Sequence, residues 1–466
     1  MWLWMTLTGC PYITDAQNAA RMPSFRLSGA YEIDEAEILI GAPVGPYGFG
    51  SALAAEELGP ADTDEGADAK ADLIVGASGR FDAEPVPGAV VVLEVLARGT
   101  SVATPSFSSP WLTGEADDGA GWSVAAIGGD LVVGAPFSLG NHPDDAGPGA
   151  VYQIPYATLR AADGFAVDAK DAPGRVRGLL QTGAGFALAT YDADNDGVDD
   201  LLASEPFAGV LGGSVVMFSA GLGERLDPNG DANVEGPLSL GTALADGDFD
   251  GDGIGDLVAG AAFAGDDNEG AAYVIPGPLR GDLSTDDALA EIAGPGAIRL
   301  GYEVDADDLD GDGLDDLVLA APEGTQGDVA TGALWWIRAS DLASGDPAAL
   351  AAGSVRGDED GDACCTVSVG DVDLDGIGDV LVGAPGQNGS SGAAALFYGP
   401  LEGSATLGDA PFRVVGQNRS GATGYAVLLA DVTDDEHLDV LIGAPFESLV
   451  GEDFAGAVGI FVGVGR

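Results

Sequence analysis

One stretch of this sequence reads Asp371-Val372-Asp373-Leu374-Asp375-Gly376-Ile377-Gly378-Asp379-Val380-Leu381-Val382-Gly383-Ala384-Pro385. Aspartates stand at positions 1, 3, 5 and 9 of this stretch, and an apolar run that ends in Gly-Ala-Pro follows directly. An apolar run that glycine and proline stop is typical of a short strand with its terminating turn. The stretch therefore predicts an acidic loop that leads into a β-strand.

The pattern recurs along the chain. Acidic loops cover residues 192–201, 248–257, 308–317, 371–380 and, in degenerate form, 431–440. Seven residues before each loop, and at two equivalent positions without a regular loop, stands a small residue that an aromatic residue often follows. These positions are Gly48, Gly121, Gly185, Gly241, Gly301, Cys364 and Gly424, spaced 56 to 73 residues apart. The sequence thus contains seven related units.

Each unit has room for four strands. A third strand that opens with small residues follows each turn, as in Gly332-Ala333-Leu334-Trp335. A fourth strand precedes the next unit, as in Phe412-Arg413-Val414-Val415-Gly416. Four short strands per unit, repeated in series, are typical of propeller blades. We predict an all-β fold, a seven-bladed β-propeller of four-stranded blades.

These units resemble the FG-GAP repeats of integrin α-subunit propellers and their bacterial relatives, from about Pro23 to the end of the chain. The resemblance implies that the acidic loop joins the first two strands of a blade and binds calcium. It also implies that partners bind the opposite face, where the loops between second and third strands gather. Those loops are residues 81–87, 137–148, 207–211, 263–269 and 446–455. Blades 1 and 2 depart from the pattern, with an irregular stretch at residues 62–72 and a short turn at residues 127–130.

The two ends of the chain predict how the ring closes. The last unit stops after its third strand, and Phe25-Arg26-Leu27-Ser28-Gly29 matches the fourth-strand pattern. We therefore expect this N-terminal strand to complete the last blade, which removes exposed sheet edges. One propeller domain is predicted over residues 23–466, with residues 30–47 as an insertion or vestigial hairpin. That segment contains an eighth Gly-Ala-Pro, so an eight-bladed ring is the alternative.

The chemistry of the loops predicts calcium. Carboxylates crowded into nine residues repel one another unless a cation lies among them, and oxygen ligands at alternating positions favour calcium over transition metals. Four sites are expected, with a weaker fifth in which Thr433 replaces an aspartate; the alternative is a solvated turn. The predicted ligands, with backbone carbonyls at position 7, are Asp192, Asp194, Asp196, Val198 and Asp200; Asp248, Asp250, Asp252, Ile254 and Asp256; Asp308, Asp310, Asp312, Leu314 and Asp316; Asp371, Asp373, Asp375, Ile377 and Asp379; and Asp431, Thr433, Asp435 and Asp439.

Composition narrows the class of partner. Acidic residues outnumber basic ones by 76 to 17, a formal charge of −59, which disfavours nucleic acid and anionic membranes. The three cysteines cannot form a disulfide framework. For Cys364 and Cys365 we expect a packing role, with a vicinal disulfide as the alternative. Residues 1–22 resemble a lipoprotein signal segment that would lipidate Cys10, although no basic residue precedes the apolar run.

The sequence favours binding over catalysis. Its two histidines and the lack of a Gly-x-Ser-x-Gly motif offer little to a histidine-based hydrolase. No catalytic residue is predicted, and the aromatic residues Phe49, Trp122, Phe186, Tyr302 and Tyr425 are interpreted as core residues between blades. We expect a monomeric, extracytoplasmic adhesion or ligand-binding module with structural calcium, in a bacterial envelope or secreted, whose partner is an extracellular protein or glycan. The alternative is an enzyme built on a propeller that acts on polysaccharide or another extracellular substrate.

Overall fold

The fold comes from a computed structural model. It describes residues 29–32, 36, 38–41, 48–56, 58, 71–78, 87–93, 111–116, 118–137, 148–161, 166–178, 182–208, 212–225, 229–326, 329–358, 362, 364, 366–418, 420–447 and 456–463. The predicted signal segment with Cys10 and most of residues 62–72 lie outside these described residues. No helix of the described chain has both the length and the apolar character that crossing a bilayer requires.

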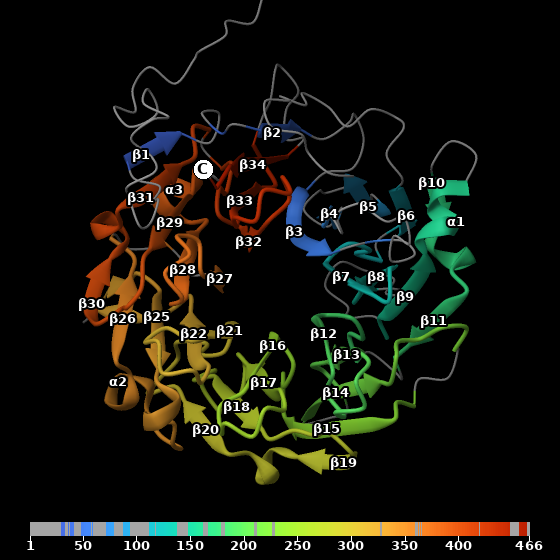
Figure 1. Cartoon of the computed structure of the whole chain (residues 1–466), viewed down its shortest axis with the longest axis horizontal. Coiled ribbons are helices and arrows are strands. Elements are labelled where there is room, and N and C mark those ends of the chain that lie inside the picture. Colours follow the sequence, from blue (N-terminus) through green and yellow to red (C-terminus); the bar gives the residue numbers. More distant parts are fainter. Residues whose placement is uncertain are drawn as a thin grey trace, which may run out of the picture.

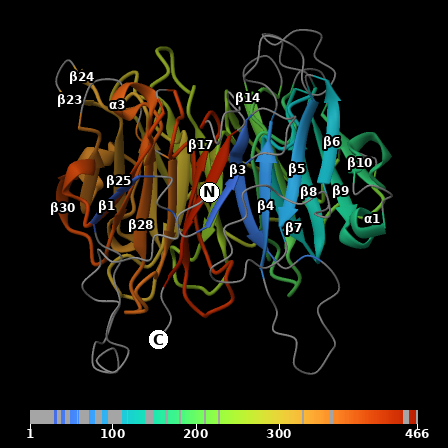
Figure 2. The same cartoon turned by 90° about the horizontal axis from the view of Figure 1, so that it is seen from above.

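Seven sheets stand around a central axis, one after another in chain order (Figure 1). Seen from the side, their strands run between the two faces of the ring (Figure 2). In each blade the first strand is innermost, and the fourth is the outermost of the blade's own four strands. The seven-bladed propeller of four-stranded blades is therefore confirmed, and the eight-bladed alternative is excluded.

The blades repeat one antiparallel order of strands. Blade 1 contains β3 (Phe49–Glu56), β4 (Asp72–Ala77), β5 (Pro87–Leu93) and β6 (Trp111–Ala116). Blade 2 contains β7 (Ser123–Ile127), β8 (Asp130–Ala135), β9 (Ala150–Pro155) and β11 (Gly174–Arg177). Blade 3 contains β12 (Leu188–Tyr191), β13 (Asp200–Glu205), β14 (Gly212–Phe218) and β15 (Ala232–Pro237). Blade 4 contains β16 (Leu244–Gly247), β17 (Asp256–Ala261), β18 (Ala271–Ile275) and β20 (Ala290–Ala293).

The remaining blades follow the same order. Blade 5 contains β21 (Glu303–Asp307), β22 (Asp316–Ala321), β25 (Ala333–Ile337) and β26 (Gly353–Arg356). Blade 6 contains β27 (Thr366–Gly370), β28 (Asp379–Ala384), β29 (Ala393–Phe397) and β31 (Phe412–Val415). Blade 7 contains β32 (Ala426–Ala430), β33 (Asp439–Ala444), β34 (Ala457–Phe461) and the N-terminal β2 (Ile38–Gly41). A small hairpin, β23 (Thr325–Gln326) with β24 (Val329–Ala330), and the short helices α1 (Tyr156–Ala161), α2 (Pro347–Leu350) and α3 (Gln387–Ser390) lie in the connections.

The N-terminus closes the ring, but through a different strand from the predicted one. β2 pairs antiparallel with β34, placing Ile38 opposite Ile460 and Ile40 opposite Val458. Both isoleucines of β2 are fully buried, in a cluster that joins blades 7 and 1. The segment interpreted as an insertion or vestigial hairpin, residues 30–47, thus contains the closing strand. That interpretation was wrong because a lone Ile-Leu-Ile-Gly run resembles a second strand as closely as a fourth.

The predicted closing strand, Phe25 to Gly29, lies mostly outside the described residues. Its last residue begins β1 (Gly29–Glu32), which pairs parallel with β31 on the outer edge of blade 6. Three other short strands pair in parallel with the fourth strand of an earlier blade. These are β10 (Ala166–Asp168) on β6, β19 (Gly281–Ser284) on β15 and β30 (Gly403–Thr406) on β26. Each precedes the fourth strand of one blade and pairs with the blade before it, so these straps link neighbouring blades.

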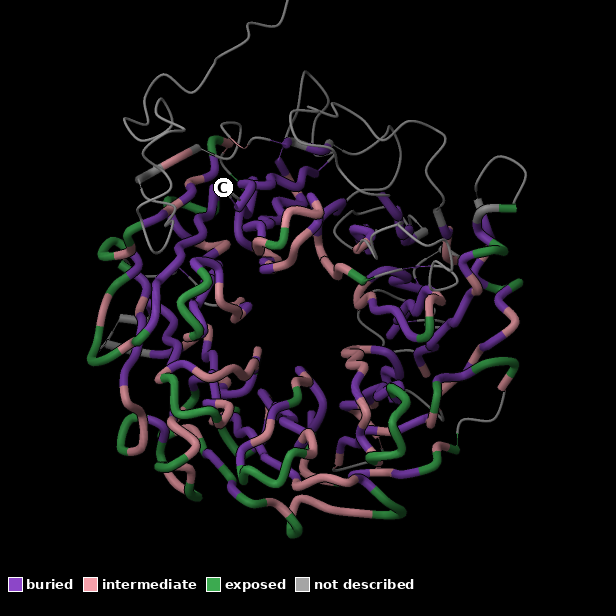
Figure 3. Tube along the Cα trace, viewed as in Figure 1, coloured by how far each residue is buried: buried purple, intermediate pink, exposed green. Residues whose placement is uncertain are grey.

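Apolar side chains fill the junctions between blades. Among the described residues they form seven clusters, and each combines residues of two neighbouring blades. The second strands lie in the middle of the sheets, and β17, β22, β28 and β33 are buried along their whole length. Figure 3 shows the buried residues within the blades and the exposed ones in the connecting loops and at the outer rim. Burial on both faces explains why these strands read as continuous apolar runs.

Close backbone contact explains the paired glycines of the repeat. A Cβ atom on Gly260 would lie 2.1 Å from the carbonyl oxygen of Gly301 in the next blade, too close for any side chain. Gly443 of blade 7 faces Gly50 of blade 1 in the same way. The glycine of blade 1 is therefore Gly50, and the prediction of Gly48 was wrong because two glycines flank Phe49. In blade 5, Leu300, which directly precedes the repeat glycine Gly301, pairs with Gly270. In blade 6, Cys364 pairs with Gly332 in the same way, so Cys364 lies one position before the place of the repeat glycine.

Candidate metal centres

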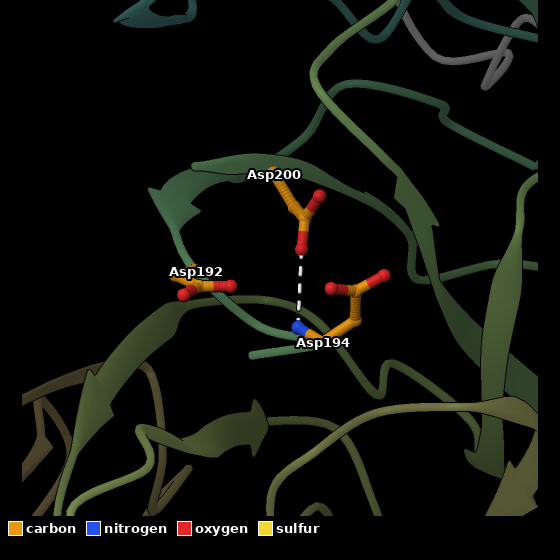
Figure 4. Close-up of side chains that lie close together, drawn as sticks. All are labelled: Asp192, Asp194 and Asp200. Atoms are coloured by element: carbon orange, nitrogen blue, oxygen red, sulfur yellow. Dashed lines mark hydrogen bonds between the residues drawn. The ribbon is translucent and has the colours of Figure 1, made fainter. Parts of the chain in front are cut away.

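The four regular acidic loops bring the same three carboxylates together. The groups are Asp192, Asp194 and Asp200; Asp248, Asp250 and Asp256; Asp308, Asp310 and Asp316; and Asp371, Asp373 and Asp379, each with one oxygen per residue within 4.8 Å of the others. These are positions 1, 3 and 9 of the loops. Figure 4 shows the first group, in which the backbone amide of Asp194 donates to Asp200.

The first aspartate of each loop shapes the turn. In blade 3, Oδ1 of Asp192 accepts from the amide of Asp196 and Oδ2 accepts from the amide of Gly197, both at 2.9 Å. The glycine at position 6 has φ near +90° there, a conformation that side chains disfavour. Asp371 accepts from Asp375 and Gly376 in the same way. The loop can form this tight turn because the carboxylates accept hydrogen bonds from backbone amides that would otherwise contact only solvent.

The predicted aspartates of position 5 have a different role from those of positions 1, 3 and 9. Asp196, Asp252, Asp312 and Asp375 each accept a hydrogen bond from the amide two residues later, at 2.9 to 3.1 Å. They are exposed and do not belong to the four groups of three. The structure thus separates a group at positions 1, 3 and 9 from an acid that supports the turn. The position 7 carbonyls of Val198, Ile254, Leu314 and Ile377 stay a prediction as ligands.

The last aspartate of each loop is buried and joins the loop to the body of the blade. Oδ2 of Asp256 accepts from the amide of Phe249 at position 2, and Oδ1 accepts from Gly277 after the third strand, at 2.8 Å. Asp379 repeats this arrangement with Val372 and Gly399. Burial outweighs these hydrogen bonds and raises the pKa of Asp256 to about 6 and the pKa of Asp379 to about 7. A cation beside these carboxylates would favour their ionised form.

The donor set fits a hard divalent cation. Oδ1 of Asp194 is buried and meets no hydrogen-bond donor among the described residues, although it lies in the first group. Calcium bonds oxygen at 2.3–2.6 Å, so ligand atoms around one ion lie up to about 5 Å apart. Three carboxylates within 4.8 Å, one with an unsatisfied oxygen, therefore match calcium in size and charge.

The degenerate loop keeps the turn but loses one acid of the group. Asp431 accepts from the amides of Asp435 and Glu436, and Oδ2 of Asp439 accepts from the amide of Thr433. Glu436 has φ of 66° where the regular loops have glycine. Within the described chain this loop forms no group of three acidic side chains, because a hydroxyl stands at position 3. That agrees with the weaker site expected there, which stays a prediction.

Every blade starts its second strand with an aspartate, which was not predicted for blades 1 and 2. Asp72 and Asp130 begin β4 and β8, in the two blades without a regular loop. Asp72 accepts from the amide of Leu58, and Asp130 accepts from the side-chain amide of Gln153 at 3.0 Å. The signal was present in the sequence as an acidic residue followed by Leu or Val at the start of each apolar run. The aspartate at position 9 therefore stabilises the start of the second strand even in blades that lack the rest of the acidic loop.

Aromatic side chains gather in blades 2 and 3 at the ends of the first two strands that lie opposite the acidic loops. Trp122 contacts Phe137 with ring centroids 5.1 Å apart and contacts Phe186 at 5.4 Å, and Phe186 contacts Phe207 at 6.2 Å. Trp122, Phe186 and Phe207 are half-buried. We call Phe137, Trp122, Phe186 and Phe207 the aromatic row; it crosses blades 2 and 3.

The interpretation of the repeat aromatics as core residues is corrected by their exposure. Phe49 is fully buried in the junction of blades 7 and 1, but Tyr302 is 38% exposed and Tyr425 is half-buried. Of the loops proposed for partner binding, residues 263–269 are described in full and the rest only in part.

Cys364 is buried and disulfide-bonded, and its partner cysteine lies outside the described residues. The expectation of a packing role alone is therefore too narrow. The side chain still packs in the cluster that joins blades 5 and 6.

Comparison with known proteins agrees with this geometry. The FG-GAP repeat family matches residues 300–335, 366–397 and 423–461, which are parts of blades 5, 6 and 7. The chain is 31% identical over 154 residues to phosphatidylinositol-glycan-specific phospholipase D of Rattus norvegicus, covering 30% of this chain and 18% of that protein. It is 33% identical over 178 residues to integrin alpha-8 of Gallus gallus, covering 35% and 15%. Integrin alpha pat-2 of Caenorhabditis briggsae is 32% identical over 161 residues, covering 29% and 13%. The matched part spans less than a fifth of each of these relatives.

Proposed function

We propose that this chain, a β-propeller of FG-GAP repeats related to integrin alpha chains, is a calcium-stabilised ligand-binding module that works outside the cytoplasm, in adhesion or ligand capture and not in catalysis. The observation that carries the proposal is the division between the two faces. Acidic groups built for a cation stand on one face, and partly exposed aromatic rings stand on the other.

Calcium has a structural part in this proposal. Asp192, Asp194 and Asp200 would hold the ion in blade 3, and the equivalent residues would hold it in blades 4 to 6. The chemistry that calcium supplies when bound is neutralisation of the clustered carboxylates. Asp200 connects the loop to the turn after the third strand through the amide of Ala220, so fixing the loop also stiffens the blade.

The aromatic row would form part of the binding surface. Tryptophan and other aromatic residues often dominate the energy of protein interfaces, because they bury a large area at small entropic cost. Acidic groups stand near it, among them Glu205, whose pKa burial raises to about 7. Asp266 and Asp267 are exposed in the neighbouring loop of blade 4. This composition favours a basic or metal-bridged extracellular protein or glycan over an anionic partner.

The extracytoplasmic location rests on the relationship to integrin alpha chains. Anchoring through a lipid on Cys10, in a bacterial envelope, is a further part of the proposal. Metabolic labelling with palmitate, compared between the natural chain and Cys10→Ser, tests the anchor. Label on the natural chain alone supports it, and an unlabelled natural chain contradicts it.

Screening protein and glycan arrays with calcium and with chelator tests the binding function. We expect a ligand whose binding requires calcium and falls at least tenfold in Trp122→Ala and Phe186→Ala. Leu289→Ala is the matched control, because Leu289 is an apolar side chain 43% exposed at the outer rim of blade 4. Equal losses in all three variants, with unchanged melting temperatures, contradict a binding surface at the aromatic row.

The second candidate function is that of an enzyme built on the propeller. The similarity to proteins named phosphatidylinositol-glycan-specific phospholipase D supports this candidate. Its substrate would be an extracellular polysaccharide or another extracellular molecule. Incubating the chain with ligands from the array and analysing the products by mass spectrometry separates the candidates. A cleaved ligand overturns the proposal of a binding module.

A further inference from the structure

One cation of the chain stands beside a predicted calcium ligand. Nε of Arg338, directly after β25, lies 2.9 Å from Oδ2 of Asp310. The side chains of Arg338 and Asp310 are only 30% and 24% exposed. Their contact is an ion pair and not a well-aligned hydrogen bond, because Nε meets no acceptor at a suitable angle. Asp310 belongs to the group of blade 5, with Asp308 and Asp316.

This contact distinguishes blade 5 from blades 3 and 4, which also have regular loops. Of the ion pairs between described residues, only this one includes a member of the acidic groups of blades 3, 4 and 5. Arg280 approaches the loop of blade 3, but it donates to the backbone carbonyl of Asp194 at 2.8 Å and leaves the carboxylate unpaired. The groups of blades 3, 4 and 5 therefore have the same kinds of ligand but differ in the charged residues beside them.

A guanidinium on a ligand carboxylate opposes a divalent ion. It neutralises part of the charge that would attract calcium, and it repels the ion at short range. Arg338 also has a second partner, because its terminal nitrogen lies 3.4 Å from Oε1 of Glu402. Glu402 is 80% exposed and directly precedes β30, the strap from blade 6 onto blade 5. The arginine can thus leave Asp310 without losing every ion-pair partner.

We propose that Arg338 competes with calcium at the blade 5 site. It lowers the calcium affinity of this site below the affinities of the blade 3 and blade 4 sites, and it turns to Glu402 when calcium binds. The inference rests on the calcium binding of the proposed function and deepens it, since it makes the four sites unequal. Blade 5 then fills after blades 3 and 4 as the calcium concentration rises. Its filling shifts the side chain of Arg338 toward the strap that links blade 5 to blade 6.

Terbium titration tests this competition, with luminescence excited through tryptophan. Trp335 and Trp336 lie in β25, next to β22, which begins with Asp316, so they report on blade 5. Arg338→Gln should tighten terbium binding by about fivefold, the equivalent of an ion pair of about 1 kcal/mol. Arg338→Lys keeps the charge and should lie between the natural chain and the glutamine variant. Glu402→Gln should weaken binding, because it removes the alternative partner.

Arg299→Gln is the matched control. It removes the same charge from an arginine that pairs with Glu323 and stacks on Phe263, away from the acidic loops. Calcium displacement of terbium and calcium-dependent melting temperatures provide readouts independent of tryptophan. Unchanged or weaker binding in Arg338→Gln overturns the inference, and so does an equal gain in Arg299→Gln. Absence of any calcium or terbium binding by the natural chain would instead contradict the proposed function itself.

Discussion

Asp315 in blade 5 and Asp248 in blade 4 hold neighbouring acidic loops together through two hydrogen bonds. The amide of Asp248 donates to Oδ2 of Asp315 at 2.8 Å, and the amide of Asp315 donates to the carbonyl oxygen of Asp248 at 3.2 Å. Asp248 is a member of the blade 4 group, and Asp315 directly precedes Asp316 of the blade 5 group. Gly378 of blade 6 donates to the carbonyl of Asp308 in the same manner. The predicted calcium sites of blades 4 to 6 therefore form one connected arc.

Breaking this connection should change the stability of the chain and the calcium binding of the neighbouring blade together. Asp315→Ala removes a carboxylate that accepts an amide, and hydrogen bonds to charged groups contribute about 1.5–3 kcal/mol when buried. Since Asp315 is half-buried, we expect a loss of about 1 kcal/mol in the free energy of unfolding, together with weaker calcium binding in blade 4. Chemical denaturation and calorimetric calcium titration measure both effects. A variant with natural stability and natural affinities contradicts the connection.

Removing calcium should lower the stability of the whole propeller. A ligand that binds only the folded chain stabilises it by about 2.7 kcal/mol when its concentration is a hundredfold above its dissociation constant. We expect the melting temperature, followed by calorimetry, to fall in chelator and to recover when calcium is restored. Magnesium at the same concentration is the control, and it should restore less. Identical melting in calcium and in chelator contradicts calcium-stabilised loops.

Losing a position 9 aspartate should remove a site only where a regular loop exists. Asp379→Asn should reduce the calcium stoichiometry by one, because Asp379 belongs to the blade 6 group. Asp130→Asn is the matched control, since Asp130 occupies the same place in blade 2 but bonds Gln153 instead. Isothermal calorimetry counts the sites. Equal stoichiometry in both variants contradicts the assignment of the group.

Glu303 should make the stability depend on pH. Burial, followed by repulsion from Asp305, raises the pKa of this half-buried side chain on β21 to about 8. A raised pKa means that the folded state favours the protonated form, so its stabilisation is present below pH 4.5 and is lost as the pH rises through 8. Glu303→Gln should therefore be more stable than the natural chain at pH 9, by roughly 2 kcal/mol or more, and similar at low pH. Parallel loss of stability in the two proteins would contradict the raised pKa.

The close backbone contact between blades 4 and 5 predicts that Gly260 does not tolerate a side chain. Gly260→Ala would place a methyl group 2.1 Å from the carbonyl oxygen of Gly301, so the junction of blades 4 and 5 must open. We expect a loss of about 3 kcal/mol or more, since overpacking costs 1–3 kcal/mol even where side chains can move. Gly296→Ala is the control, because nothing lies within 4 Å of its added methyl group. Similar melting temperatures for the two variants contradict the tight contact.

The repeat and its local chemistry could be predicted from the sequence alone. Each acidic loop combines turn residues with carboxylates inside ten residues, so its pattern is short-range and repeats visibly from Asp192 onward. Seven such units of four strands leave a propeller as the arrangement that pairs every strand. The members of the groups at positions 1, 3 and 9 were all among the predicted ligands.

Only the tertiary structure decided the long-range choices. Two N-terminal segments had strand patterns, and pairing with β34 selected Ile38–Gly41 over the segment ending at Gly29 because Ile38 and Ile40 fill the junction with blade 1. The approach of Arg338 to Asp310 likewise depends on strands meeting across a sheet, 28 residues apart in sequence. A sequence specifies its turns through neighbouring residues, whereas the burial and charge of a site depend on which distant residues the closed ring brings beside it.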